Sequence, residues 1–262
     1  MPVFESRHPL VKHKITCAAP PPSPTSHFHS LQIDSPTSYT PSRAACRLLR
    51  DKRTSPYQFR QLVGELCALV GYEATIDLSL KPKAVTTPLV DTTGCETSDV
   101  VGLVPVLRAG IGMVDPFLSM LPNAQVCPPP PPRAAADIAF ISLPSQVWHL
   151  GMYRDPKTLA PVSYYNKFPQ EVTCSKAYVL DPMLATGGTA VAALSTVKEW
   201  GCSNVSLVCL LASPEGIKAV EAEHPDVKIY LAHVDERLNE KGYILPGLGD
   251  AGDRIFSTEK TH

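Results

Sequence analysis

Five short apolar runs, most of them followed by a segment of helical character, constrain the fold of this chain more than any other feature of its sequence. Several runs are apolar at nearly every position, as expected of strands that are buried on both faces. Strands that alternate with helices favour a parallel sheet covered by those helices. We therefore predict an α/β fold. The predicted strands lie at residues 99–107, 147–153, 176–180, 204–212 and 228–234.

Apolar residues at helical spacing predict an early helix over residues 55–75. Ser55 is suited to cap its N-terminus, and Pro56 fits its first turn. Gly201 is placed to end a later helix as a C-cap. Further helices are predicted at residues 109–122, 189–201 and 213–225.

Composition excludes several classes of protein. The chain has 262 residues with 44% hydrophobic content, enough for a full-sized core, and its net charge of −1 gives no overall attraction for nucleic acid or an anionic membrane. No apolar run approaches the roughly 20 residues of a membrane-spanning helix. The eight cysteines are scattered without a C-x-x-C pair, so no zinc cluster or disulfide framework is indicated. We expect a cytoplasmic protein with reduced thiols, without a nucleic-acid or membrane partner.

Two segments differ from the rest in composition. Residues 17–47 are dense in Pro, Ser and Thr and lack any period of 2 or 3.6, so we expect a disordered loop. Residues 127–146 open with a proline run, which favours polyproline II and cannot join a sheet ladder. We expect one domain over residues 1–262, interrupted by these two inserts.

The stretch "AYVLDPMLATGGTAVAAL" at 177–194 contains the strongest chemical signal. Thr186, Gly187, Gly188 and Thr189 are expected where a strand ends and a helix begins, so their backbone N–H groups can converge on an anion. Asp181 precedes this turn and cannot itself bind a phosphate, but a carboxylate there suits sugar hydroxyls or a cation held by a diphosphate. Seen alone, the turn is also compatible with an ordinary strand-to-helix connection.

With its surroundings, this stretch resembles a known family. "DPMLATGGT" at 181–189 is similar to the phosphoribosyl-diphosphate loop of type I phosphoribosyltransferases, in the uracil phosphoribosyltransferase version. Further segments resemble that family in the same order and extend the resemblance to roughly four-fifths of the chain. They are "HPLVKHK" at 8, "YEAT" at 72, "VPVLRAGIGMVDP" at 104, "GMYRDPKTL" at 151, "SPEGI" at 213, "HPDVKIY" at 224 and "NEKGYILPGLGDAGDRIF" at 239.

The resemblance implies a fold and a reaction. The fold is a mostly parallel sheet flanked by helices, with a small hood and a flexible arm. The reaction transfers the 5-phosphoribosyl group from phosphoribosyl diphosphate to N1 of uracil, giving uridine monophosphate (UMP) and diphosphate, a step of pyrimidine salvage. It requires Mg²⁺, which the diphosphate carries, so no direct metal ligand is expected from the protein.

The resemblance also assigns residues to the site. Arg108, Arg154, Asp181 and Asp250 are the implied catalytic residues, with the two arginines on the diphosphate, where a guanidinium fork stabilises growing negative charge. The implied uracil pocket has Ile244 against the ring and the backbone at Gly249 and Ala251 reading its edge, with Asp250 beside them. The implied phosphoribosyl-diphosphate ligands are Arg108, Arg154, Asp181, Pro182, Met183, Leu184, Ala185, Thr186, Gly187, Gly188, Thr189 and Asp250.

The segment 155–169 resembles the family's flexible arm, which reaches a neighbouring subunit or covers the site. This implies a homo-oligomer, a dimer or tetramer. GTP is an effector in some family members, and the sequence leaves that question open here.

Departures from the family pattern leave alternatives open. Removing residues 17–47 and 127–146 restores the pattern in register, so we interpret both as translated introns, which sequencing of the mature message tests. The second insert interrupts the strand leading to Arg154, and a catalytically impaired binding or regulatory module is therefore the alternative function. A purine or orotate transferase would need another pocket sequence than "ILPGLGDAGD". Ser257 replaces the family's usual glycine, which affects the turn after the base pocket.

Overall fold

The computed structural model describes residues 28–30, 47–121, 146–154, 161–166, 168–169 and 171–258. Within these residues the central feature is a nine-stranded sheet, parallel except where β7 runs antiparallel to β6. Its order is β1 (Phe28–Ser30), β11 (Lys228–Val234), β10 (Val205–Ala212), β8 (Lys176–Leu180), β4 (Val101–Leu107), β6 (Leu150–Arg154) and β7 (Pro161–Asn166). The short strands β5 (Gln146–Val147) and β9 (Met183–Leu184) pair with β4 and β10.

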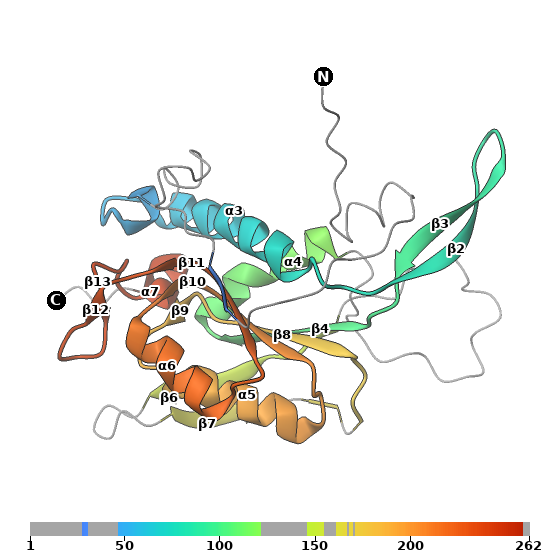
Figure 1. Ribbon diagram of the computed structural model, residues 1–262. Coiled ribbons are helices and arrows are strands. Elements are labelled where there is room, and N and C mark those ends of the chain that lie inside the picture. Colours follow the sequence, from blue (N-terminus) through green and yellow to red (C-terminus); the bar gives the residue numbers. More distant parts are fainter. Residues whose placement is uncertain are drawn as a thin grey trace.

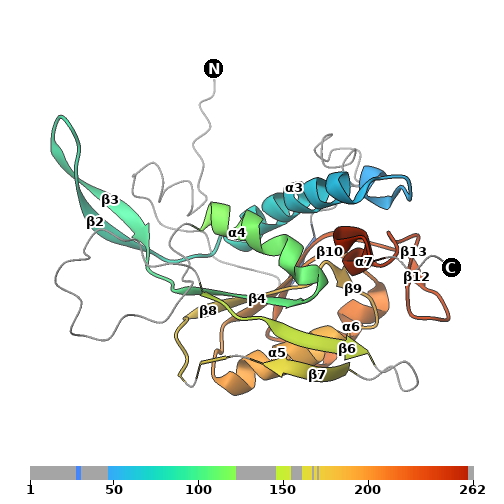
Figure 2. The same cartoon turned by 180° about the vertical axis from the view of Figure 1, so that it is seen from behind.

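Helices cover both faces of the sheet, as the alternating pattern predicts (Figures 1 and 2). One face carries α3 (Pro56–Ala74), the 3-10 helix η1 (Ala109–Met113), α4 (Val114–Met120) and α7 (Ala251–Phe256). The other face carries α5 (Gly188–Trp200) and α6 (Pro214–Glu223). This confirms the predicted α/β fold.

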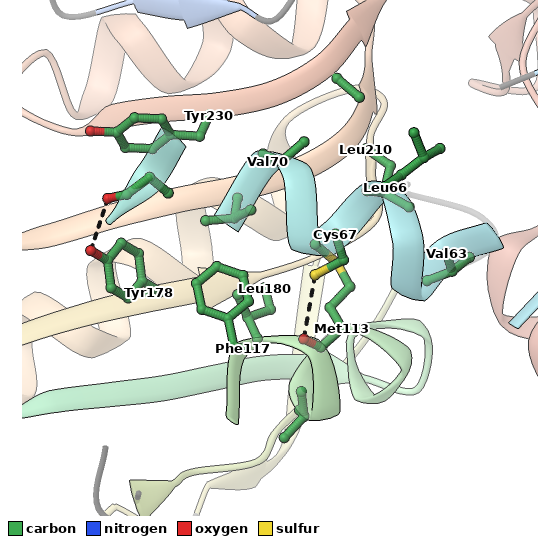
Figure 3. Packing of buried hydrophobic residues seen from close by; sticks show 14 of the residues in the cluster. Val63, Leu66, Cys67, Val70, Met113, Phe117, Tyr178, Leu180, Leu210 and Tyr230 are labelled. Atoms are coloured by element: carbon green, nitrogen blue, oxygen red, sulfur yellow. Dashed lines mark hydrogen bonds between the residues drawn. The ribbon is translucent and has the colours of Figure 1, made fainter. Parts of the chain in front are cut away.

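The two faces have separate hydrophobic cores, because neighbouring residues of a strand point to opposite sides. Leu103 packs in the cluster beneath α3, while Val104 packs in the cluster against α5 and α6. Figure 3 shows the first cluster, where Phe117 and Tyr178 fill the space between α4 and the sheet. Each such side chain contributes about 1.5–3 kcal/mol when fully buried.

Helix α3 forms where the sequence predicts it. Ser55 accepts a hydrogen bond from the Gln58 N–H, the Gln58 side chain accepts one from the Ser55 N–H, and Pro56 occupies the first turn. This reciprocal capping satisfies two backbone donors that a helix start otherwise leaves unpaired.

Two predicted elements are interrupted. The strand expected over 147–153 is divided into β5 and β6 at Trp148 and His149. The Trp148 ring packs onto Gly102, where an added Cβ would lie 2.1 Å from the indole. The helix expected over 109–122 begins instead as the 3-10 helix η1 and continues as α4 only to Met120.

The prediction of a loop throughout residues 17–47 is wrong at residues 28–30, which form β1 and pair in parallel with β11. At the end of the segment, Arg47 already belongs to a helical turn over residues 47–50. An edge strand needs only backbone hydrogen bonds, so a hydrophobic pattern does not reveal it. Most of the second insert lies outside the described residues, and Gln146 at its end belongs to β5.

The sequence did not reveal the hairpin of β2 (Leu80–Thr86) and β3 (Asp91–Thr97), which projects from the body in Figure 1. The predicted arm is described only in part, since 155–160 lie outside the described residues and 161–166 form β7. A small sheet of β12 (Arg237–Leu238) and β13 (Ile244–Leu245) follows β11. None of the helices in the described part of the chain is long and apolar enough to cross a membrane.

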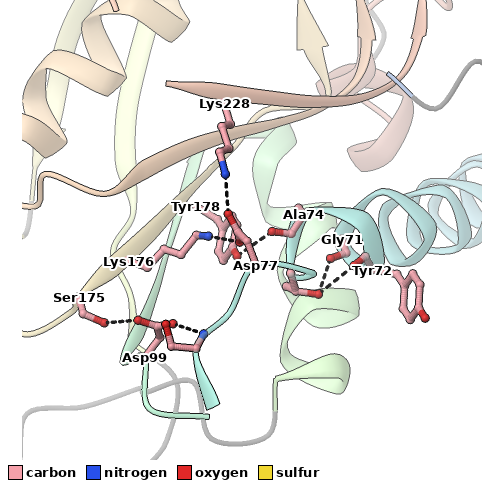
Figure 4. A network of polar contacts seen from close by, with 11 residues as sticks. Gly71, Tyr72, Ala74, Asp77, Asp99, Ser175, Lys176, Tyr178 and Lys228 are labelled. Carbon is pink, nitrogen blue, oxygen red and sulfur yellow. Dashed lines mark hydrogen bonds and ion pairs between the residues drawn. The ribbon is translucent and has the colours of Figure 1, made fainter. Parts of the chain in front are cut away.

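A polar network lies at the amino ends of the strands, away from the predicted phosphate turn (Figure 4). Asp77, just after α3, forms ion pairs with Lys176 at the start of β8 and, at 2.8 Å, with Lys228 at the start of β11. Only 3% of the Lys176 side chain is exposed. Burial alone would raise the pKa of the Asp77 carboxyl, but the two ammonium groups lower it below its ordinary value.

Candidate active site

The glycine-rich turn lies between β8 and α5, as the sequence predicts. Asp181 follows β8 directly, and α5 begins at Gly188 with Gly187 as its N-cap. The Asp181 carboxylate accepts a hydrogen bond from the Met183 N–H at 3.2 Å, which holds it at the start of the turn. The first N–H groups of a helix have no partner within it, so this turn is suited to bind an anion.

Helix α6 and its N-cap Ser213 pack against the glycine-rich turn. Gly187 has a φ of +85°, and an added Cβ would lie 2.6 Å from the Ala219 Cβ and 2.9 Å from the Gly216 carbonyl oxygen. The Ser213 hydroxyl donates to the Ala185 carbonyl at 2.6 Å. Sequence reasoning gave no supporting role to Ser213 or Gly216, although both lie in the segment "SPEGI" that resembles the family.

Part of the predicted phosphoribosyl-diphosphate loop serves the fold. The Pro182 carbonyl accepts hydrogen bonds from the N–H groups of Leu210 and Leu211. Leu184 is buried among core residues. The anion-binding part of the loop is therefore expected to be its C-terminal half, Thr186–Thr189.

Arg108 lies at the same edge of the sheet, because β4 pairs in parallel with β8. Its guanidinium contacts the Asp253 carboxylate at 3.1 Å and donates to the Thr258 hydroxyl at 3.2 Å. The residues directly after Arg108 are tightly packed, since a Cβ on Gly110 would lie 2.3 Å from the Leu180 carbonyl oxygen. The Arg108 side chain is 54% exposed, so an anionic ligand can reach it and would compete with Asp253.

Arg154 is the last residue of β6, which pairs in parallel with β4. Its backbone is therefore placed at the carboxyl edge that also carries Arg108 and Asp181. The structure describes only the backbone there, and the predicted contact of the Arg154 side chain with a diphosphate stays a prediction.

A pocket of about 860 Å³ opens beside Arg108, within the size range of small-molecule sites. Four side chains of the lining are cationic and two are carboxylates, so the lining favours an anionic ligand. The lining residues are Arg50, Lys52, Arg108, Pro246, Gly247, Leu248, Gly249, Asp250, Asp253, Arg254 and Thr258.

The residues predicted to bind uracil divide into two groups. Gly249 and Asp250 line the pocket, and the Asp250 carboxylate caps α7 by accepting the Asp253 N–H at 2.9 Å. Ile244 and Ala251 are 4% and 3% exposed and belong to the core cluster beneath it. The predicted contact of Ile244 with the base stays a prediction.

The segment after β4 contacts both the end of β8, which leads into the turn, and the start of α7 beside the pocket. Gly110 packs on the end of β8, and Ala109 lies against the start of α7, where a Cβ on Gly252 would be 3.9 Å from the Ala109 Cβ. Among the described residues, no cluster of three or more His, Cys, Asp or Glu side chains is placed to hold a metal ion.

The sheet is mostly parallel, and its central strand β8 is followed by an aspartate and a glycine-rich turn at a helix N-terminus. A cation-lined pocket lies at the same edge of the sheet. These features define a phosphoribosyltransferase of type I fold. The family model described as "Uracil phosphoribosyltransferase" matches residues 42–128 and 137–258. The chain belongs to the uracil phosphoribosyltransferase family.

Relatives support the same assignment over nearly the whole chain. The uracil phosphoribosyltransferase of Roseiflexus castenholzii is 46% identical over 256 residues, which cover 98% of each protein. That of Streptococcus thermophilus is 46% identical over 213 residues, covering 81% of this chain and 92% of the relative. A solved structure of a protein from Aquifex aeolicus has a TM-score of 0.74 and 32% identity, covering 88% of this chain and 99% of that one.

Proposed function

We propose that this chain transfers the 5-phosphoribosyl group from phosphoribosyl diphosphate to N1 of uracil, in pyrimidine salvage. The bond from C1 of the ribose to the diphosphate oxygen breaks, the bond from C1 to N1 forms, and the proton of N1 is released. The products are UMP and diphosphate. The observation that carries the proposal is the family match, which includes both the phosphate turn and the loop at 244–251.

The phosphate turn suits the phosphoribosyl group. Thr186 to Thr189 supply backbone N–H groups and two hydroxyls to the 5-phosphate, and Asp181 would bind the ribose hydroxyls. As the C1–O bond breaks, positive charge develops on the sugar, which a carboxylate stabilises. Negative charge develops on the leaving diphosphate, which Arg108 and Arg154 stabilise.

The pocket suits the base. Backbone groups at Gly249 and Ala251 would pair with the O2, N3 and O4 edge of uracil. Cytosine presents a different pattern of donors and acceptors there, and such mismatches can lower turnover by as much as about 10⁴-fold. Asp250 is proposed to act at the phosphoribosyl substrate beside the base.

Mg²⁺ is proposed to enter with the diphosphate, where it neutralises charge on the leaving group. The residues present fit such an ion without a ligand of their own, because the cations that line the pocket attract the diphosphate that carries it. We also propose a cytoplasmic homo-oligomer, a dimer or tetramer, which light scattering of the purified chain tests. Repeating the assay with GTP tests whether it is an effector.

The proposal is tested by incubating the full chain with uracil, phosphoribosyl diphosphate and Mg²⁺ and measuring UMP. Arg108→Ala should lower kcat by about 10²-fold or more, because a stabilising charge is lost from the transition state. Arg53→Ala, in an exposed ion pair with Asp51, is the matched control and should leave the rate unchanged. Tight binding of uracil without UMP formation would favour the binding module instead.

A further inference from the structure

A buried carboxylate, Asp235, lies directly beneath the loop that carries the proposed base-reading residues. It follows β11, and its N–H donates to the Ala212 carbonyl at 2.8 Å, which fixes it at the carboxyl edge of the sheet. Its side chain is fully buried and forms a bidentate ion pair with Arg50 at 2.6 and 2.8 Å. His233 lies 3.3 Å from the same carboxylate.

Asp235 and Arg50 together hold the backbone of Gly247 at both of its polar groups. The Gly247 N–H donates to Asp235 at 3.0 Å, and the Gly247 carbonyl accepts from Arg50 at 3.0 Å. Gly247 has a φ of +61°, and an added Cβ would lie 2.1 Å from the Ile244 carbonyl oxygen. The loop therefore turns sharply here, and the two side chains fix the turn.

A second arginine holds the next residue of the loop. Arg254 donates to the Leu248 carbonyl at 2.8 Å and to the Leu49 and Asp51 carbonyls at 2.5 and 2.6 Å. Its guanidinium lies 4.2 Å from the centre of the Phe59 ring. The loop is thus tied to residues 49–51 by contacts that do not involve the phosphate turn.

We propose that Asp235 and Arg50 are positioning residues for base recognition, because they set the place of the backbone at Gly249 and Ala251 through Gly247. This rests on the proposed function, in which that backbone reads the edge of uracil. Hydrogen bonds to a base require placement within a fraction of an ångström, and a misplacement of about 1 Å can cost about 10²-fold. The phosphate turn is held separately by α6, so a displaced base loop reaches phosphoribosyl diphosphate only through Asp250, and binding of that substrate should be affected much less than binding of uracil.

The test compares the KM for uracil with the KM for phosphoribosyl diphosphate in Asp235→Asn and Arg50→Lys. Asp235→Asn keeps the size of the side chain but loses its charge, and Arg50→Lys keeps the charge but loses the bidentate fork. We expect the KM for uracil to rise roughly 10-fold or more and the KM for phosphoribosyl diphosphate to change less than about 3-fold. Asp226→Asn and Lys83→Arg, both in exposed ion pairs far from the base loop, are the controls and should change neither KM.

The combined variant gives a second readout. If both side chains act through Gly247, the first substitution already releases the loop. The KM for uracil should then rise in the double variant by less than the product of the two single-variant increases. If Asp235→Asn does not fold, Arg50→Lys carries the test alone. A parallel rise of both KM values, or a fully multiplicative double variant, overturns the inference. Absence of UMP formation by the unaltered chain overturns the proposed function instead, so the two failures are distinguishable.

Discussion

Two residues, Gly187 and Ser257, have left-handed backbone conformations, and we expect substitutions at them to change stability in opposite directions. Gly187 at the phosphate turn has no room for a side chain, whereas Ser257, the C-cap of α7, adopts φ +57° and ψ +40° although it carries one. A left-handed conformation costs an L-residue about 1–2 kcal/mol relative to glycine.

Gly187→Ala should impair binding of phosphoribosyl diphosphate and destabilise the protein, because the added methyl meets Ala219 and the Gly216 carbonyl. We expect at least a 10-fold rise in the KM for phosphoribosyl diphosphate, roughly the effect of a misplaced binding loop. Gly64→Ala in α3 is the control, since its Cβ would meet Pro116 at 3.7 Å, an ordinary contact. Equal effects of the two substitutions would contradict this explanation.

Ser257→Gly should stabilise the protein by about 1 kcal/mol, because glycine adopts the left-handed conformation without strain. Thermal and urea unfolding measure the gain. An unchanged or lower free energy of unfolding would show that the Ser257 side chain offsets its strain with contacts of its own.

The elements differ in how far the sequence reveals them. β8 and β10 are buried at every position, so their apolar runs predicted them correctly. β2 is mostly exposed and alternates poorly, so no hydrophobic pattern predicts it. The position of the Trp148 ring could not be predicted either, since it needs the space left by Gly102, a residue on another strand.

Asp77 follows α3 and forms ion pairs with β8 and β11, so we expect stability to depend on its charge and therefore on pH. Asp77→Asn should lower the free energy of unfolding at pH 7 by about 3 kcal/mol, because the buried Lys176 loses its carboxylate partner. The pKa of Asp77 is lowered in the folded state from an ordinary value of 3.8, so its contribution is present above that pH and lost as the pH falls further.

Urea unfolding at pH 7, 5 and 2.5 measures this effect. The difference in free energy of unfolding between the wild type and Asp77→Asn should narrow at the lowest pH. Asp226→Asn, in an exposed ion pair with Lys198, should cost less than about 1 kcal/mol. A difference that stays constant down to about pH 2.5 would contradict the assigned role of the charge.

At the scale of the whole molecule, the single domain interrupted by two inserts stays a prediction. A chain lacking residues 17–47 and 127–146 loses β1 and half of β5. We expect it to keep UMP formation, since neither strand carries a proposed site residue. Its free energy of unfolding should fall on the order of 1–3 kcal/mol, since each lost backbone hydrogen bond contributes about 1 kcal/mol. Activity in the shortened chain alone would mean that the inserts silence the protein.

The sequence predicted the turn between β8 and α5 because its residues are adjacent in the chain. It could not predict that Arg50 and Arg254 tie the base loop to the segment around residue 50, because each binds a backbone carbonyl of a residue far away in the sequence. The place of Ile244 in the core depends in the same way on neighbours that only the fold brings together.

The arginine contacts that hold the base loop also set when a newly made chain can become active. Apart from the bond of Arg254 to Leu248, they join residues 185 to 205 positions apart, with one partner near residue 50 and the other at residues 235–254. At a synthesis rate of about 5–20 residues per second, roughly 10–40 s separate the two partners as they emerge from the ribosome. Arg50 therefore has none of these partners until Asp235 and Gly247 have been made, and the base pocket cannot form before then.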